Sequence, residues 1–299
     1  PQSVVELFVG DLDEAIADGI AQAIDEKVPE TIDEAMDEFG NDKSVTLLDQ
    51  EVLISVKPQT VDFSAEGGVI AIDASIVLPG LVGGEGYIPT PAVLPPALST
   101  TTDGFQIGIA DDIINVGLTQ FWSTGQMDKS FLVSDVGNGG ALSKLIDRID
   151  VRVVHPPMAM AHPDDRGLTV VVGDVFVDGM QISDGHDKLV SQLALSAEIE
   201  ITVEADVLNN LKLKAVHADF WIDSVLTSNG DRNPLDNHSL EELGSFLAMQ
   251  FTGLIGEIVG ETPLPSLKSV RFVNLNMHGS PQGGYAVLGG RLEPNLNPL

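Results

Sequence analysis

The long alternating segments in the second half of the chain constrain its fold most. Hydrophobic and polar residues alternate almost without a break in LSAEIEITVEADV, residues 195–207. A period of two is typical of a strand with one apolar and one polar face. The same pattern predicts strands at 151–154, 168–177, 189–207 and 211–226, several of them longer than the usual five or six residues. Such strands suit one strongly curved antiparallel sheet.

A long apolar helix is expected near the C-terminal end of the chain. Apolar residues recur every three or four positions between residues 239 and 259, which predicts an amphipathic helix. Ser239, followed by Glu241 and Glu242, is a candidate cap with acidic residues in the first turn. A Pro-rich turn, a strand at 270–277, a glycine hinge and a closing strand follow.

The first 39 residues predict a second long helix. Apolar residues recur at three- or four-residue spacing from Val5 to Phe39, and the faces between them are acidic. Pro29 cannot sit inside an unbroken helix, so the helix is expected over Val4 to Lys27 with a kink or restart beyond it. Each long helix has an apolar stripe that other segments must cover, so residues 1–299 are expected to form one domain.

The segment between these helices begins with strands and a long loop. The period changes to two after Gly40, which predicts strands up to residue 78. Five prolines and four glycines from Pro79 to Pro96 predict an apolar segment that is a long loop or the edge of a sheet.

Two short helices are expected next. The first runs from Asp112 to Ser123, with Asp111 or Asp112 as its cap and Gly125 as its end. The second is expected from Ala141 to Ile149.

The charge of the chain excludes some partners. Fifteen basic against 45 acidic residues give a net charge of −30, which repels nucleic acid and anionic membranes. Solubility at high salt and a basic or divalent-cation partner both remain open as reasons for this charge.

Three further features narrow the class of protein. The chain has no cysteine, so it forms no disulfide and has no thiolate metal site. We expect no transmembrane segment, because no run of 18 apolar residues exists. The start at Pro1 is that expected of a processed or engineered chain.

No catalytic motif stands out, so we expect a protein that is not an enzyme and needs no cofactor. GxSxG, HExxH, GxGxxG and P-loop patterns are absent. His155 and His162 are seven residues apart with prolines between them, which fits a turn better than a zinc site. The oxygen-rich loop at 228–237 lacks the glutamate spacing of a calcium loop and fits an Asx-rich turn better.

The order of elements in two regions points to one family. After the C-terminal helix come Pro263-Leu264-Pro265, the strand at 270–277 and GYAVLGG at 284–290. In the middle of the chain FQIGI at 105–109 precedes a helix at 114–122 and the turn Gly125-Gln126-Met127. These motifs cover about a third of the chain. They resemble the bactericidal/permeability-increasing and lipopolysaccharide-binding protein family, within the tubular lipid-binding superfamily.

The resemblance implies a fold and a function. It implies an α+β fold in which a strongly curved antiparallel sheet wraps long helices and holds acyl chains between them. A non-catalytic carrier of a phospholipid or similar amphiphile in an elongated groove is therefore expected, with bound lipid as the only ligand. The alternative is a structural or adhesion domain of the same fold with a filled core. The lining residues expected from the helices are Ile16, Ile20, Ile24, Leu118, Phe121, Trp122, Leu247, Phe251, Leu254 and Ile258.

The resemblance also sets expectations about setting and partners. The lack of cysteine indicates a bacterial member, with a periplasmic, outer-membrane-associated or secreted location and a signal segment outside this chain. Transient membrane contact and a homodimer are compatible with it. Relatives that capture lipopolysaccharide use cationic tips, but Lys188, Lys212, Lys214, Lys268 and Arg271 are scattered among acidic residues. We therefore expect no direct binding of lipopolysaccharide phosphates.

Deletion of residues 1–40 tests the single-domain expectation. If the N-terminal helix packs into the same body as residues 239–299, its loss exposes apolar surface, and the truncated chain should aggregate. Size-exclusion chromatography and thermal unfolding measure this. A truncated chain that melts cooperatively near the parent temperature would make the helix a detachable arm.

Overall fold

The structure is a computed structural model that describes most of the chain after residue 42. The described residues are 43–47, 50–64, 67–79, 104–135, 142–162, 167–183, 185–206, 211–225, 235–260 and 270–294. The expected N-terminal helix, with Ile16, Ile20 and Ile24, and most of the loop from 79 to 96 lie outside them.

The backbone divides into two compact units. One comprises Pro1–Ser44 and Ile54–Ser75, and the other comprises Val45–Leu53 and Ile76–Leu299. A three-stranded sheet of order β1-β2-β3 contributes residues to both units. Its strands are β1 (Lys43–Leu47), β2 (Gln50–Ser64) and β3 (Gly67–Val77). The single domain over 1–299 stays a prediction.

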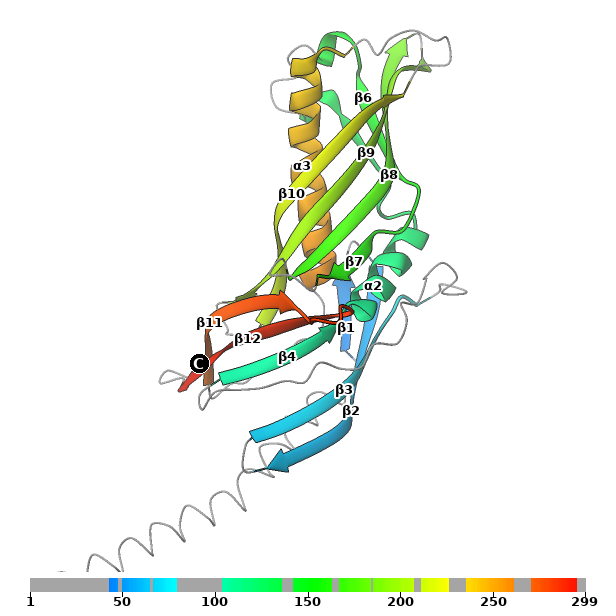
Figure 1. The fold of residues 1–299 in the computed structure, drawn as a ribbon. Coiled ribbons are helices and arrows are strands. Elements are labelled where there is room, and N and C mark those ends of the chain that lie inside the picture. Colours follow the sequence, from blue (N-terminus) through cyan, green and yellow to red (C-terminus); the bar gives the residue numbers. More distant parts are fainter. Residues whose placement is uncertain are drawn as a thin grey trace, which may run out of the picture. The chain divides into compact units, whose positions relative to one another are not determined.

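The second unit is built on a six-stranded antiparallel sheet (Figure 1). The strand order is β10-β9-β8-β6-β5, and β7 also pairs with β8. The bounds are β5 (Lys129–Leu132), β6 (Arg148–Val153), β7 (Met158–Ala161), β8 (Leu168–Ser183), β9 (His186–Ala205) and β10 (Leu211–Val225). The four strands expected from the alternating pattern are all present, and the longest has 20 residues.

The alternation along β9 separates an inner from an outer face. Every second residue from Ser191 to Val203 is buried, and the residues between them are half-buried or exposed. Because successive side chains of a strand point to opposite sides, all buried residues of β9 share one face of the sheet. We call this the inner face and the opposite one the outer face.

The long helix α3 (Asn237–Gly260) lies along this sheet (Figure 1). Its main buried stripe contains every fourth residue. A stripe with this spacing winds slowly around the helix and so follows the twist of the strands. The stripe consists of Ser239, Leu243, Leu247, Phe251, Ile255 and Val259. The helix predicted at 239–259 is therefore confirmed.

Glycines let α3 approach the edge strand β10 closely. A Cβ added at Gly244 would lie 3.1 Å from Ile222 Cδ1, and one at Gly256 would lie 3.4 Å from Ala215 Cβ. Both glycines belong to a stripe of small residues beside the main buried stripe. A larger side chain on this stripe would push the helix away from β10.

The same helix also contacts the opposite edge of the sheet. Phe246 of α3 meets Phe131 of β5 edge to face, with ring centroids 5.1 Å apart. In a flat sheet the two edges, four strand spacings apart, would be separated by about 19 Å, roughly twice the diameter of a helix. One helix can contact both edges only because the sheet is curled.

A smaller antiparallel sheet belongs to the same unit. Its order is β11-β12-β4, with β11 (Val270–Gly279), β12 (Tyr285–Pro294) and β4 (Gly104–Ala110). Gly279 crosses the backbone of His162 so closely that a Cβ there would lie 1.4 Å from the His162 carbonyl oxygen. Only glycine fits at this crossing, which joins β11 to the segment between β7 and β8.

The short helices differ in part from expectation. Helix α2 (Asp111–Ser123) is confirmed, and Gly125 follows its end with φ 74°. Its N-cap is Ala110, without a side-chain cap, because Asp111 binds β7 instead. The helix expected over 141–149 is wrong. Only a 3₁₀ turn at Leu142–Lys144 forms, since the following residues pair in β6.

The start of α3 also differs from expectation. Asp236 accepts the Ser239 backbone N–H at 2.8 Å, so Asp236 is the capping residue and Ser239 lies in the first turn. This hydrogen bond holds the pKa of Asp236 below its usual value.

Helix α3 qualifies the expectation of no transmembrane segment. By length and composition alone it could cross a membrane, although the core helix of a soluble protein passes the same test. In this structure it packs on β10 and buries eight of its residues.

Two glycines of α3 give a matched test of this packing. Gly256→Leu should destabilise the fold by about 1–3 kcal/mol, because the side chain would collide with β10. Gly253 has nothing within 4 Å of an added Cβ, so Gly253→Leu should stabilise the helix by up to about 1 kcal/mol. Urea unfolding of both variants measures the difference. Equal effects of the two substitutions would contradict the close approach of α3 to β10.

Candidate functional site: the apolar interior

The interior of the second unit is lined by aliphatic side chains from the sheet and both helices. The inner face of β9 contributes a buried row of Leu193, Leu195, Ala197, Ile199 and Ile201. The neighbouring strand β8 contributes Val170, Val172, Val175 and Val177. Contacts on this surface are stabilised by the exclusion of water, because its side chains offer few hydrogen bonds.

The lining residues expected from the helices divide into three groups. Leu118, Phe121, Leu247, Phe251 and Ile258 are buried, with exposed fractions between 0% and 5%. Trp122 and Leu254 are half-buried, and the three isoleucines of the N-terminal segment lie outside the described residues.

Two helices bring the described members of this set together. They come from α2 and α3, which contact each other. A filled core would bury these side chains in the same way as the wall of a groove, so their burial does not test the expectation. Their role in lipid binding stays a prediction.

Individual inner-face residues of the sheet were missing from the expected set. The alternation of β9 marked one face as apolar but gave no sign of which residues face α3. Which residues face the helix depends on the register between strands. For example, Ala197 lies opposite Val172 on one side and Phe220 on the other.

Polar side chains of α2 bind the free edge of β7. Asn115 donates from Nδ2 to the Ala159 carbonyl at 3.0 Å and accepts the Ala159 N–H at 2.6 Å. Asp111 Oδ2 accepts the Ala161 N–H at 3.3 Å. These side chains replace a neighbouring strand, so the buried backbone of β7 is satisfied.

The carboxyl group of Asp111 is buried and only partly paired. Its Oδ1 has no hydrogen-bond partner among the described residues, and its exposed fraction is 5%. Burial raises the pKa of Asp111, although the Ala161 N–H opposes this. Its described contact is to backbone, which indicates a structural role.

The two histidines considered for a metal site are separated in the structure. His162 is buried and its Nε2 lies 2.7 Å from Thr169 Oγ1, whereas His155 is exposed and lies 3.5 Å from Asp174. Within the described ranges no group of three or more His, Asp or Glu side chains could hold a metal ion. Most of the loop at 228–237 lies outside those ranges.

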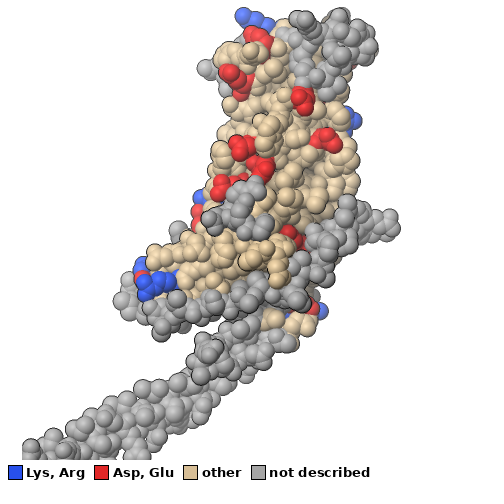
Figure 2. All heavy atoms as spheres, viewed as in Figure 1, with Lys and Arg blue, Asp and Glu red and all other residues tan. Residues whose placement is uncertain are grey.

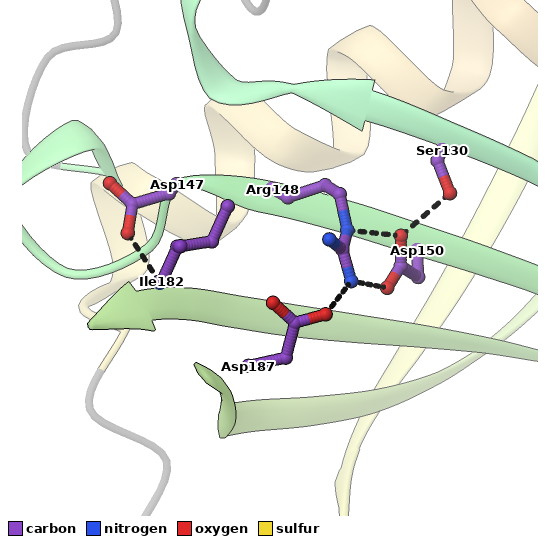
Figure 3. A network of polar contacts seen from close by, with 6 residues as sticks. All are labelled: Ser130, Asp147, Arg148, Asp150, Ile182 and Asp187. Atoms are coloured by element: carbon purple, nitrogen blue, oxygen red, sulfur yellow. Dashed lines mark hydrogen bonds and ion pairs between the residues drawn. The ribbon is translucent and has the colours of Figure 1, made fainter. Parts of the chain in front are cut away.

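An ion-pair network fixes the end of the sheet where β8 turns into β9 (Figure 3). Arg148 of β6 binds Asp150 through two nitrogens at 2.8 Å each and Asp187 of β9 at 2.7 Å. Ser130 of β5 donates to Asp150 at 2.7 Å, so three strands are linked. Arg148 lowers the pKa of Asp150 and is itself paired with two carboxylates. The network is therefore structural.

Comparisons with known proteins found similarity among solved structures alone. No protein-family model and no curated protein matches the chain. Among solved structures it is similar to a crystal structure of lipopolysaccharide binding protein, with 10% sequence identity and a TM-score of 0.44. The match covers 97% of this chain and 66% of that one, so the chain spans just under two thirds of that protein.

Asp111→Asn tests the buried carboxyl group. Because burial raises its folded pKa, the folded protein holds this proton more tightly than the unfolded chain does. Wild-type stability should therefore fall as the pH rises from the unfolded value, about 3.9, through the folded value. The variant lacks this titration, so it should gain stability relative to the wild type over that window. Urea unfolding at several pH values measures the gain. A constant difference at all pH values would contradict it.

Proposed function

We propose that the chain is a non-catalytic carrier of a phospholipid or similar amphiphile. The acyl chains would lie between α3 and the inner face of the curled sheet, and no cofactor or metal would take part. A periplasmic, outer-membrane-associated or secreted bacterial setting, with transient membrane contact, belongs to the same proposal.

One observation carries this proposal: α3 contacts both edges of one curled sheet whose inner face is aliphatic. Gly244 and Gly256 lie against β10, and Phe246 lies against Phe131 of β5. The helix and the sheet thus enclose an elongated apolar interior. The helix could separate from β10 or from β5 without breaking hydrogen bonds between strands. The opening would admit an acyl chain.

Hydrophobic area would supply the affinity. Burial of some fifteen methylene groups at about 0.8 kcal/mol each would contribute roughly 12 kcal/mol before ordering costs reduce it. An aliphatic wall with few polar groups makes no demand on headgroup chemistry, so the carrier would accept several lipids.

A second candidate is a structural or adhesion domain with a filled core. It is favoured by the near-complete burial of the inner face, where Val170, Val172 and Ala197 are 0% exposed. Side chains that touch only one another leave no room for cargo in that conformation. The two candidates differ in what a purified sample contains and in how it responds to a larger inner side chain.

Two tryptophan substitutions on α3 separate the candidates. Leu247 is 0% exposed on the main buried stripe, and Met249 is 63% exposed on the other side of the helix. In a carrier, Leu247→Trp should lower lipid occupancy and change the melting temperature little, and Met249→Trp should change neither. In a filled core, Leu247→Trp should cost about 1–3 kcal/mol.

Mass spectrometry of an organic extract, together with urea unfolding, measures both quantities. The extract should come from protein expressed in bacteria and purified without detergent. A wild-type extract free of lipid, combined with a large loss of stability in Leu247→Trp, would refute the carrier.

A further inference from the structure

The outer face of the sheet carries an exposed tryptophan on its edge strand. Trp221 of β10 is 55% exposed and is the one aromatic side chain among the exposed large hydrophobic residues described. Ser196 lies directly opposite it on β9, and Ala194 lies opposite Asp223. Because these neighbours are small, one side of the indole ring stays open.

Carboxylates surround this tryptophan on the same face. Asp219 and Asp223 stand two residues before and after it, so both point to the same side of β10. Glu198 lies opposite Asp219. Figure 2 shows acidic side chains, set among uncharged ones, over the part of the molecule where Figure 1 places β9 and β10. We call Trp221, Asp219, Asp223, Ser196 and Ala194 the Trp221 surface.

The same arrangement of an aromatic ring and an aspartate occurs on β8, two strands from β10, and there it holds an arginine. Phe176 and Asp178 of β8 are also an aromatic residue and an aspartate two positions apart on the outer face. Arg152 of β6 lies over the Phe176 ring, 5.5 Å from its centroid, and 3.9 Å from Asp178. The guanidinium group thus satisfies the ring face and the carboxylate together.

The corresponding position at Trp221 has no cation from the described part of the chain. Among the described strands β10 is at the edge of its sheet, so none of them lies beside it as β6 lies beside β8. Lys212 and Lys214 of β10 pair with Asp206 and Glu204 instead. His217, the third basic residue of β10, lies 3.4 Å from Asp219, so Asp223 is the carboxylate left for a partner. The arrangement that holds Arg152 is therefore repeated without its arginine.

We propose that the Trp221 surface docks an arginine-bearing segment of a partner protein. The partner's guanidinium would stack on the indole of Trp221 and pair with Asp223, as Arg152 does with Phe176 and Asp178. The net charge of −30 would speed its approach and repel acidic partners. This inference does not depend on lipid in the interior.

A set of peptides and variants tests the proposal on the full chain. The probe is an acetylated peptide of four Arg-Gly repeats, with Lys-Gly and Glu-Gly versions for comparison. The Arg-Gly peptide should bind the wild type more tightly than the Lys-Gly peptide, because lysine lacks the planar group that stacks. The Glu-Gly peptide should not bind.

Substitutions on the surface should weaken this binding selectively. Trp221→Ser should weaken Arg-Gly binding about five- to thirtyfold, and Trp221→Phe should restore part of it. Asp223→Asn should also weaken it. Glu241→Gln and Glu257→Gln each remove the same charge from the exposed side of α3 and should change the affinity less than about twofold. Thermal unfolding of each variant confirms that it folds.

Three results would overturn the proposal. The first is Arg-Gly binding that is as tight in Trp221→Ser as in the wild type. The second is an equal loss in the α3 variants, which would mean diffuse attraction to an acidic protein. The third is no Arg-Gly binding combined with a Trp221-dependent shift in fluorescence on addition of phosphatidylcholine vesicles, which would assign the surface to a lipid headgroup.

Discussion

The contact of α3 with both edges of one sheet determines the architecture of the second unit. Gly244 lets the helix approach the Ile222 side chain of β10, Gly256 lies against Ala215 of the same strand, and Phe246 contacts Phe131 on β5. With both edges held, the strands between them must curl, and their inner face must be apolar because the helix excludes water from it. The lipid-carrier proposal and its filled-core alternative both start from this enclosed interior and differ only in what fills it.

The two faces of the sheet are stabilised by different kinds of interaction. The inner face is aliphatic and is stabilised by burial, so its residues are interchangeable within limits of volume. The outer face is stabilised by specific pairs of side chains, such as the ion pair of Arg148 with Asp150 and the cation–π contact of Arg152 with Phe176. Trp221 stands out because it has the neighbours of such a pair and lacks the arginine. Cargo and partner would thus use opposite faces of the same strands.

Long periodic elements could be predicted from the sequence, and short ones could not. The alternation of β9 and the spacing of α3 extend over some twenty residues, so local noise averages out. The helix expected over 141–149 failed because pairing of Arg148 with Met180 in the sheet outweighs a weak local preference. The expected capping residues were also wrong. The Asp111 side chain binds the backbone of β7 instead of capping α2, and Asp236 instead of Ser239 caps α3.

The sequence by itself determined that strands of this length exist, which of their faces is apolar and that the surface is strongly acidic. These are properties of single segments, set by side-chain periodicity and charge. Only the tertiary structure decided which segments meet. It placed Phe246 against Phe131, Asn115 on the edge of β7 and Ser196 beside Trp221. Such contacts depend on strand register and on the order of strands in the sheet, and neither leaves a mark in the local pattern of residues.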